Sequence, residues 1–272
     1  MKYILLTLTG LLTIASCSNK ITRVQQQNNS SASIAYNELK VLCYNIHHAN
    51  PPSKPDLIDI DAIANVIKKE NPDVVALQEI DKLTKRSGSV NEAKLIAEKT
   101  GMKYHFFKAI DHDGGEYGTM MLSKMPFTDI KSIPLPEAFP GEDRVLAYMT
   151  VSLPSGKRFI LANTHMDAQR NDATRTLQMK AILEEFKTKT EPIIFCGDFN
   201  SIDTSEAIRL LDEQFKRTCT QNCPGTIPVI NPVKTIDYIT LKNADWEVKE
   251  HRVIPETYAS DHRPVVVTFK MN

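Results

Sequence analysis

Hydrophobic residues recur along most of the chain in short runs without alternating polar positions. Val74-Val75-Ala76-Leu77, Ile193-Ile194-Phe195-Cys196 and Val265-Val266-Val267 are three such runs. Strands that are covered on both faces have this pattern, so we expect buried sheets. The expected strands cover residues 40–46, 73–78, 103–108, 118–123, 144–153, 157–164, 192–197, 236–241, 246–253 and 264–270.

Three segments between these strands have a helical period instead. In 59–70, isoleucines fall on one stripe, Asp59 suits the N-cap position, and Asn71-Pro72 ends the segment. The segment 91–100 is followed by Gly101, a typical helix-ending residue, and 171–187 again places its apolar residues on one face. Strands mixed with these helices predict an α/β protein in which two packed sheets carry helices on their outer faces.

The N-terminus has the pattern of an export signal. Residues 3–14 are mostly apolar but too few to span a membrane, and they lead into Ile14-Ala15-Ser16-Cys17, which looks like a bacterial lipobox. Lipidation of Cys17 is expected, the alternative being ordinary secretion with an unmodified cysteine. The following segment is rich in Ser, Asn and Gln, as in flexible tethers. The predicted organisation is a signal peptide (1–16), lipidated Cys17 with its tether (17–37) and one domain (38–272).

Composition narrows the class of partner. The 272 residues include 33 Lys+Arg and 33 Asp+Glu, so the chain as a whole has no net charge with which to attract nucleic acid.

Cys43 and Cys196 lie in apolar runs and are expected to be buried thiols. Cys219 and Cys223 lie in a turn-rich segment, and in an exported protein they either form a small disulfide or stay free.

Polar side chains gather where the expected strands end. The C-terminal ends of four strands carry Asn45, Gln78-Glu79, Asn163-Thr164-His165 and Gly197-Asp198-Phe199-Asn200. Ser260-Asp261-His262 precedes its strand, so an antiparallel orientation would bring it to the same rim. The oxygen ligands expected to hold a cation are Asn45, Glu79, Asp198, Asn200 and Asp261. Such ligands suit a hard cation, Mg²⁺ or alternatively Mn²⁺, beside the donors of His165 and His262.

Seven motifs in order along residues 40–270 resemble the endonuclease/exonuclease/phosphatase superfamily, in particular its bacterial metal-dependent hydrolase branch. They are Tyr44-Asn45-Ile46, Leu77-Gln78-Glu79, Tyr117-Gly118 with Leu122-Ser123, Asn163-Thr164-His165, Gly197-Asp198-Phe199-Asn200-Ser201, Ile236-Asp237-Tyr238-Ile239 and Ser260-Asp261-His262. The resemblance implies the deoxyribonuclease-I-like fold, a four-layer α/β/β/α sandwich of two mixed sheets. One departure is Thr119, where the family often has Asn after the glycine.

The resemblance also implies hydrolysis of a phosphate ester by in-line attack of water, with roles for each motif residue. Glu79 and Asn45 would hold Mg²⁺, and Asp261 would help to place it. Asp198 would deprotonate the water, and Asn200 would donate to the transition-state oxygen. His165 and His262, the latter oriented by Asp237, would hold the phosphate or protonate the leaving group. The residues expected to contact the substrate are Arg144, His47 and Tyr117.

Two classes of function are thereby predicted. The first is a metal-dependent phosphodiesterase or phosphatase, monomeric, lipid-anchored in the bacterial envelope on its periplasmic or cell-surface face, and touching the membrane through the anchor alone. A lipid head group, a small phosphoester or nucleic acid would be its substrate. The alternative is a non-catalytic binding protein that holds a phosphorylated ligand on the same fold.

Overall fold

The structure, a computed structural model, describes residues 1–4 and 37–272. The chain divides into two units, Met1–Ser33 and Ile34–Asn272, and the fold below is that of the second. Cys17, the rest of the predicted lipobox and nearly all of the predicted tether lie outside the described residues. None of the described helices is long and apolar enough to cross a membrane.

Within residues 37–272, twelve strands form two mixed sheets of six. The first sheet has the order β11-β12-β1-β2-β4-β3, and the second has the order β5-β6-β7-β8-β10-β9. In the first sheet the strands are β1 (Glu38–Asn45), β2 (Val74–Lys82), β3 (Lys103–His112), β4 (Gly115–Ser123), β11 (Glu247–Val253) and β12 (Val265–Lys270). In the second they are β5 (Phe127–Pro134), β6 (Val145–Ser152), β7 (Arg158–His165), β8 (Ile193–Asp198), β9 (Lys216–Arg217) and β10 (Asp237–Lys242).

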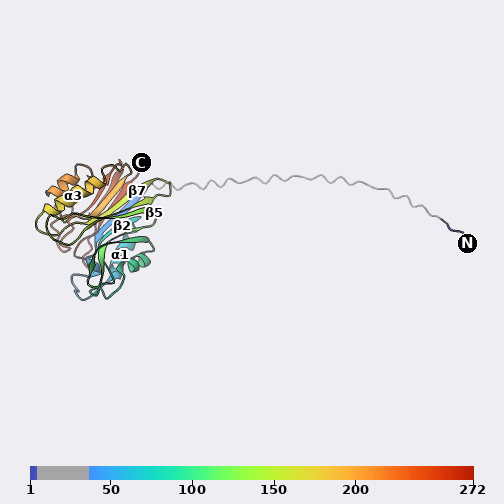
Figure 1. Cartoon of the computed structure of the whole chain (residues 1–272), viewed down its shortest axis with the longest axis horizontal. Coiled ribbons are helices and arrows are strands. Elements are labelled where there is room, and N and C mark those ends of the chain that lie inside the picture. Colours follow the sequence, from blue (N-terminus) through green and yellow to red (C-terminus); the bar gives the residue numbers. More distant parts are fainter. Residues whose placement is uncertain (5–36) are drawn as a thin grey trace. The chain divides into compact units, whose positions relative to one another are not determined.

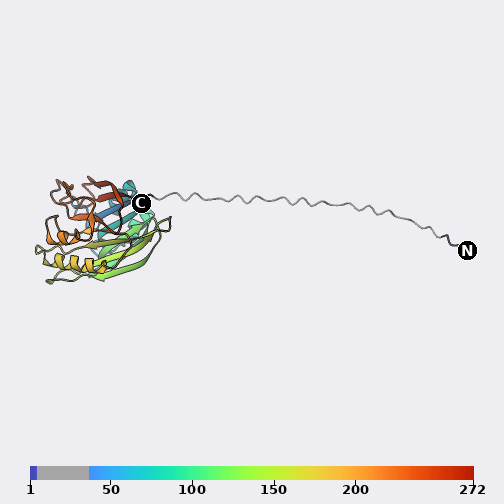
Figure 2. The same cartoon turned by 90° about the horizontal axis from the view of Figure 1, so that it is seen from above.

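The sheets pack face to face, and helices cover their outer faces (Figures 1 and 2). Helices α1 (Ile60–Glu70) and α2 (Glu92–Thr100) cover the first sheet, and α3 (Ala173–Glu185) and α4 (Glu206–Leu211) cover the second. This is the four-layer α/β/β/α sandwich of the deoxyribonuclease-I-like fold, and the predicted fold class is confirmed.

The buried sheets explain the unbroken apolar runs. Along β1, Val41 and Cys43 face the core between the sheets, while Leu42 and Tyr44 face the core under the helices. Side chains alternate between the faces of a strand, so a strand with a core on each side has no position for a polar residue. Burial of both faces therefore removes the alternation that a half-exposed strand would show.

The predicted elements are present, with small shifts at their ends. Asp59 caps α1 by accepting a hydrogen bond from the Ala62 backbone, and Asn71 and Gly101 end α1 and α2 with left-handed φ angles of 50° and 69°. Helix α3 is shorter than the expected 171–187. The sequence pattern did not indicate β5, β9, α4 or the single turn η1 (His47–Ala49). Strand β5 is a mostly exposed edge strand, and β9 and α4 are too short to show a period.

Strand directions bring the polar ends together. β1 and β2 are parallel, as are β7 and β8, whereas β12 is antiparallel to β1 and β10 is antiparallel to β8. The C-terminal ends of the parallel pairs thus share one rim with the N-terminal ends of β10 and β12. In this register, Asp198 lies opposite both Asp237 and His165.

The cysteines fall into two groups. Cys219 and Cys223 form a disulfide, one of the two alternatives left open by the sequence. Cys43 and Cys196 are free and buried, as expected.

Candidate active site

Asn45 joins the two sheets at the rim. Its side-chain nitrogen donates to Glu79 Oε1 of the first sheet and to Asp198 Oδ2 of the second, both at 3.0 Å. Its side-chain oxygen accepts a hydrogen bond from the His47 backbone N–H, also at 3.0 Å. That bond fixes the orientation of the amide, so Asn45 turns its donor toward the carboxylates and its oxygen away from them.

Glu79 reaches the rim because β2 is irregular there. The register with β4 shifts between Leu77 and Ile80, and Glu79 itself has a left-handed φ of 59°. A β-bulge of this kind redirects a side chain. Burial opposes ionisation of Glu79, but the neighbouring His48, His165 and Asn45 outweigh it and hold its pKa well below the usual range. Glu79 is therefore a carboxylate at any physiological pH.

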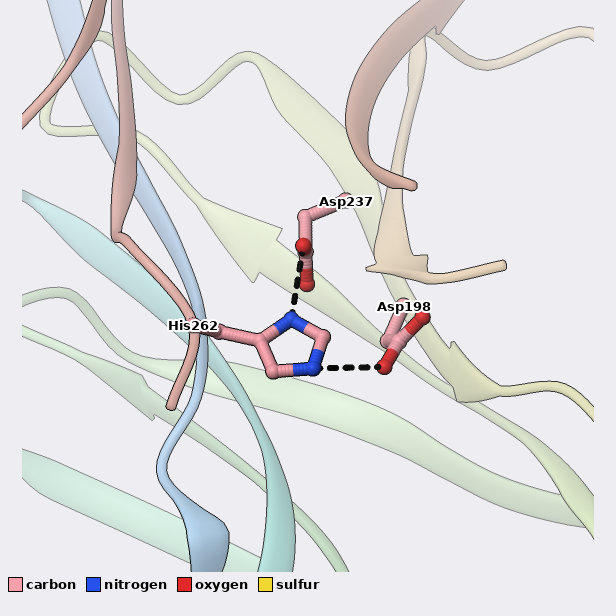
Figure 3. Close-up of side chains that lie close together, drawn as sticks. All are labelled: Asp198, Asp237 and His262. Atoms are coloured by element: carbon pink, nitrogen blue, oxygen red, sulfur yellow. Dashed lines mark hydrogen bonds and ion pairs between the residues drawn. The ribbon is translucent and has the colours of Figure 1, made fainter. Parts of the chain in front are cut away.

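Asp198, His262 and Asp237 form a buried group in which the imidazole lies between two carboxylates (Figure 3). His262 Nδ1 is 2.8 Å from Asp237 Oδ2, and Nε2 is 3.6 Å from Asp198 Oδ2. The Ser260 hydroxyl holds this segment in place, since it donates to the Asn45 carbonyl and accepts from the His262 backbone N–H. The three side chains thus have the geometry of a carboxylate that orients a histidine beside a second carboxylate.

The same contacts shift the protonation of the group. Burial and the nearby Asp237 raise the pKa of Asp198 to about 7. Burial opposes a charged imidazole at His262, but Asp237 and Asp198 outweigh it and raise its pKa to about 10. His165, whose Nε2 lies 3.6 Å from Asp198 Oδ2, is buried beside Arg144, and both effects lower its pKa well below the ordinary value. At neutral pH the site therefore holds a charged imidazole, His262, and a neutral imidazole, His165. Both lie next to the Asp198 carboxyl group, whose pKa is close to 7.

A small cavity opens beside His165. It is lined in part by Tyr117, Thr119, Arg144 and His165. Within the described residues, Thr119 Oγ1, Arg144 Nε and His165 Nδ1 are buried without a hydrogen-bond partner. Buried polar atoms are ordinarily paired, so three unpaired atoms around one cavity indicate a place for a ligand oxygen or a water molecule.

The remaining predicted residues lie at different distances from this cluster. Asn200, with φ 47°, donates its backbone N–H to Asp198 Oδ1 at 2.9 Å and its side-chain amide to the Met166 carbonyl. Asp261 is half-buried, and its Oδ1 lies 3.3 Å from the Ser260 hydroxyl, whose hydrogen is donated to the Asn45 carbonyl. The ring of His47 bonds to the Asn50 carbonyl at 2.8 Å. The roles assigned to these three residues stay predictions.

Two side chains outside the predicted set also face the site. Thr119 lines the cavity, and the sequence contains a signal for it because Thr119 is two residues from Tyr117 on one strand and so shares its face. His48 places Nδ1 at 3.8 Å from Glu79 Oε2. Its only signal in the sequence is its place in a histidine pair directly after Asn45-Ile46, which does not indicate the direction of either ring.

The donor set fits a divalent cation near Glu79. Asp198, Asp237 and His262 lie within 4.8 Å of one another, close enough for a metal site. However, the 2.8 Å hydrogen bond between His262 and Asp237 already engages both partners, which suits an orienting pair better than two ligands. Glu79 keeps Oε2 outside its hydrogen bond to Asn45 and is ionised, so it is the better anchor for a cation. Asp198 is linked to Glu79 because both accept from the Asn45 amide nitrogen.

Comparisons with known proteins agree with this geometry. A sequence profile described as "Endonuclease/Exonuclease/phosphatase family" matches residues 42–262. No curated protein shows a significant match. Among solved structures, an endonuclease/exonuclease/phosphatase from Beutenbergia cavernae is similar with a TM-score of 0.72 and 22% identity, over 87% of this chain and 72% of that one.

Two further solved structures carry more specific names. The human Nocturnin catalytic domain with bound sulfate is similar with a TM-score of 0.69 and 19% identity, over 88% of this chain and 95% of that one. The mannosyl-6-phosphatase Bt3783 of Bacteroides thetaiotaomicron is similar with a TM-score of 0.65 and 19% identity, over 84% of this chain and 98% of that one. At these identities the likeness establishes the shared fold.

Proposed function

Because the chain belongs to the endonuclease/exonuclease/phosphatase family, we propose that it hydrolyses a phosphate ester with the help of Mg²⁺ or Mn²⁺. Members of this family are hydrolases that act on phosphoesters. The observation that carries the proposal is the buried group of Asp198, His262 and Asp237 beside Glu79. A protein that only bound a phosphorylated ligand would have no need of a water-activating carboxylate next to an oriented histidine.

The residues of the group divide the work of an in-line displacement. Asp198, with a pKa of about 7, takes the proton from the attacking water, since a general base works best when its pKa is near the operating pH. His262 is cationic and directs its Nε2 into the site, where it holds a phosphoryl oxygen or gives a proton to the leaving group. A divalent cation, held by Glu79, would neutralise charge on the phosphoryl oxygens.

The cavity beside His165 receives a further oxygen of the phosphoryl group. Arg144 and Thr119 present unpaired donors to it, and Arg144 is 7% exposed. An arginine at this position attracts an anion even though one of its other nitrogens, Nη1, is paired with Glu142 at 3.0 Å. Replacement of the family's frequent asparagine by Thr119 thus keeps a donor at that position.

The test is hydrolysis by the purified chain with Mg²⁺, with Mn²⁺ and with EDTA. The substrate panel contains plasmid DNA, sphingomyelin, phosphoinositides and sugar phosphates. These represent the nucleic-acid, lipid and small-phosphoester alternatives, so the substrate that is hydrolysed distinguishes among them. Sugar phosphates belong in the panel because one solved relative is a mannosyl-6-phosphatase. Hydrolysis is expected with a metal and is expected to stop with EDTA. Full activity in EDTA, or binding without turnover across the panel, would contradict the proposal.

Asp198→Asn is the matched variant for this assay. It is expected to fold and to lose roughly 10²–10⁴-fold in kcat, the usual cost of removing a general base. Asp203→Asn changes an exposed carboxylate five residues further along and should retain wild-type turnover. Wild-type turnover in Asp198→Asn would remove Asp198 from its role.

We further propose that the protein is exported and lipid-anchored through Cys17. The support is the lipobox Ile14-Ala15-Ser16-Cys17 after a short apolar segment. Cys17→Ser is expected to move the protein from the membrane to the soluble fraction of cells expressing the full chain, and to abolish incorporation of a labelled fatty acid. Membrane association and labelling that survive this substitution would refute the anchor.

A further inference from the structure

His48 and Glu79 face each other at the rim without a direct hydrogen bond. His48 Nδ1 lies 3.8 Å from Glu79 Oε2, and within the described residues this buried nitrogen has no hydrogen-bond partner. Hydrogen bonds between nitrogen and oxygen are 2.7–3.2 Å long, so the two atoms are too far apart to bond directly. Two ligands that each bind one ion at roughly 2.0–2.3 Å are separated by about 3–4.5 Å. The gap fits a shared cation.

The turn that carries His48 is held in a strained conformation. His47, His48 and Ala49 have φ angles of 48°, 41° and 52°, in the left-handed region that non-glycine residues rarely adopt. Each such residue costs on the order of 1–3 kcal/mol. Two backbone hydrogen bonds close the turn, from Ala49 N–H to the Ile46 carbonyl at 2.9 Å and from Asn50 N–H to the His47 carbonyl at 2.8 Å.

Strain of this kind is typical of functional sites. In this turn, the strained backbone determines where the His48 ring points. His47 turns its own Nδ1 to the Asn50 carbonyl, while His48 turns its Nδ1 to Glu79. The turn thus fixes one histidine as a structural partner of the loop and leaves the other with a free nitrogen at the carboxylate.

The Asn45 amide does not supply an oxygen ligand for a cation beside Glu79. Its oxygen accepts from the His47 backbone, and its nitrogen donates to Glu79 and Asp198. Asn45 therefore positions both carboxylates but offers no oxygen toward the gap. Glu79 Oε2, the oxygen that does not bond to Asn45, has His48 Nδ1 at 3.8 Å.

We infer that His48 Nδ1 binds, together with Glu79 Oε2, the divalent cation of the site, and that this nitrogen makes the site prefer transition-metal ions such as Mn²⁺ over Mg²⁺. The inference rests on the metal-dependent function proposed above and deepens it. Imidazole ligands suit Fe, Ni, Cu and Zn best, whereas Mg²⁺ is held by oxygen ligands and water. Mn²⁺ also favours oxygen ligands, but as a transition-metal ion it accepts an imidazole nitrogen more readily than Mg²⁺ does. The proton of the imidazole then resides on Nε2, because a coordinating nitrogen must have a free electron pair.

Electron paramagnetic resonance of Mn²⁺ bound to the full chain tests the inference without any substrate. Pulsed spectra should show modulation from a coordinated ¹⁴N nucleus, replaced by the ¹⁵N pattern when histidine alone is ¹⁵N-labelled. His48→Asn should lose this nitrogen signal and bind Mn²⁺ at least about 10-fold more weakly. His105→Asn removes a histidine near the start of β3 and should leave both the signal and the affinity unchanged.

His48→Asp extends the comparison to metal preference. It places an oxygen ligand beside Glu79, so it should retain a cation, lack the nitrogen signal and shift the ratio of Mn²⁺ to Mg²⁺ affinity toward Mg²⁺. A nitrogen signal that persists in His48→Asn, or its absence from the wild type, would overturn the inference.

Crystals of the wild-type chain soaked in Mn²⁺ give an answer that does not depend on the folding of a variant. An anomalous peak within roughly 2.3 Å of His48 Nδ1 is expected, and a peak outside coordination distance of that atom would refute the assignment. Neither measurement depends on turnover. Failure to find a substrate would count against the proposed function while leaving the metal assignment intact.

Discussion

At the scale of single residues, His262 owes its charge to its neighbours. Asp237 accepts the hydrogen bond of Nδ1 and, with Asp198, raises the pKa of the imidazole to about 10 against the effect of burial. The folded-state pKa is above the ordinary 6.5, so the stabilising charge is fully present below pH 6.5. It is lost as the pH rises from 6.5 through about 10.

Asp237→Asn should therefore lower the pKa of His262 while preserving the orientation of its ring, since the amide oxygen still accepts from Nδ1. An NMR titration of the His262 ring in metal-free protein measures this directly. The alkaline limb of the kcat/KM profile should move to lower pH, because the charged form is then lost earlier. Asp203→Asn is the control, and an unchanged His262 titration in Asp237→Asn would show that Asp237 does not set the charge.

At the scale of elements, β2 and α2 are joined by a buried carboxyl group. Glu92, fully buried at the start of α2, accepts a hydrogen bond from the Asp81 backbone N–H at 2.9 Å. Burial, together with the nearby Asp81, raises its pKa from the ordinary 4.5 to about 8. Glu92 is thus protonated in the folded protein at neutral pH, whereas it is ionised in the unfolded chain.

This difference predicts a pH dependence of stability. The contribution of Glu92 is fully present below pH 4.5 and is lost as the pH rises from 4.5 to about 8. Glu92→Gln keeps the acceptor and cannot ionise, so its advantage over the wild type should grow across that window to a few kcal/mol. Urea unfolding at several pH values measures it, with the exposed Glu98→Gln of the same helix as control. A constant difference between the Glu92→Gln variant and the wild type would contradict the raised pKa.

At the scale of the whole molecule, a buried pair of side-chain amides connects the two sheets by hydrogen bonds. Gln78 of the first sheet donates to Asn163 Oδ1 of the second at 2.7 Å. Asn163 in turn donates to the Leu77 and Met120 carbonyls at 2.8 and 3.1 Å. The active site draws Asn45 and Glu79 from the first sheet and Asp198 from the second, so the relative position of the sheets determines its geometry.

Asn163→Ala should accordingly affect both stability and activity. It removes a hydrogen-bond partner from Gln78 Nε2 and from the Leu77 and Met120 carbonyls, and we expect the free energy of unfolding to fall by about 2–4 kcal/mol. Urea denaturation measures the loss, and a lower kcat at temperatures where the variant is folded would show that the sheets have shifted. Asn65→Ala, at an exposed position of α1, should be nearly neutral. A similarly neutral Asn163→Ala would mean that the apolar core alone sets the spacing.

The sequence by itself determined the sandwich and most of the rim. Strand-like segments, many of them unbroken apolar runs that indicate burial on both faces, predicted ten of the twelve strands within residues 37–272. The edge strand β5 was not predicted because most of its side chains are exposed and its apolar residues show no two-residue period. The rim residues were found because polar groups stand out where a buried apolar run ends, as at Asn45, Glu79 and Asp198, although β2 continues past Glu79 to Lys82.

Only the tertiary structure decided how these groups meet. The direction of the Asn45 amide depends on the His47 backbone, the charge of His262 on two carboxylates from other strands, and the role of His48 on a left-handed turn. The charge of His262 depends on contacts between residues far apart in the chain, and the other two depend on a local backbone conformation that residue type does not encode. The pattern of apolar residues along a strand indicates burial. The orientation and protonation of the rim side chains depend on neighbouring groups that come into contact with them only in the folded protein.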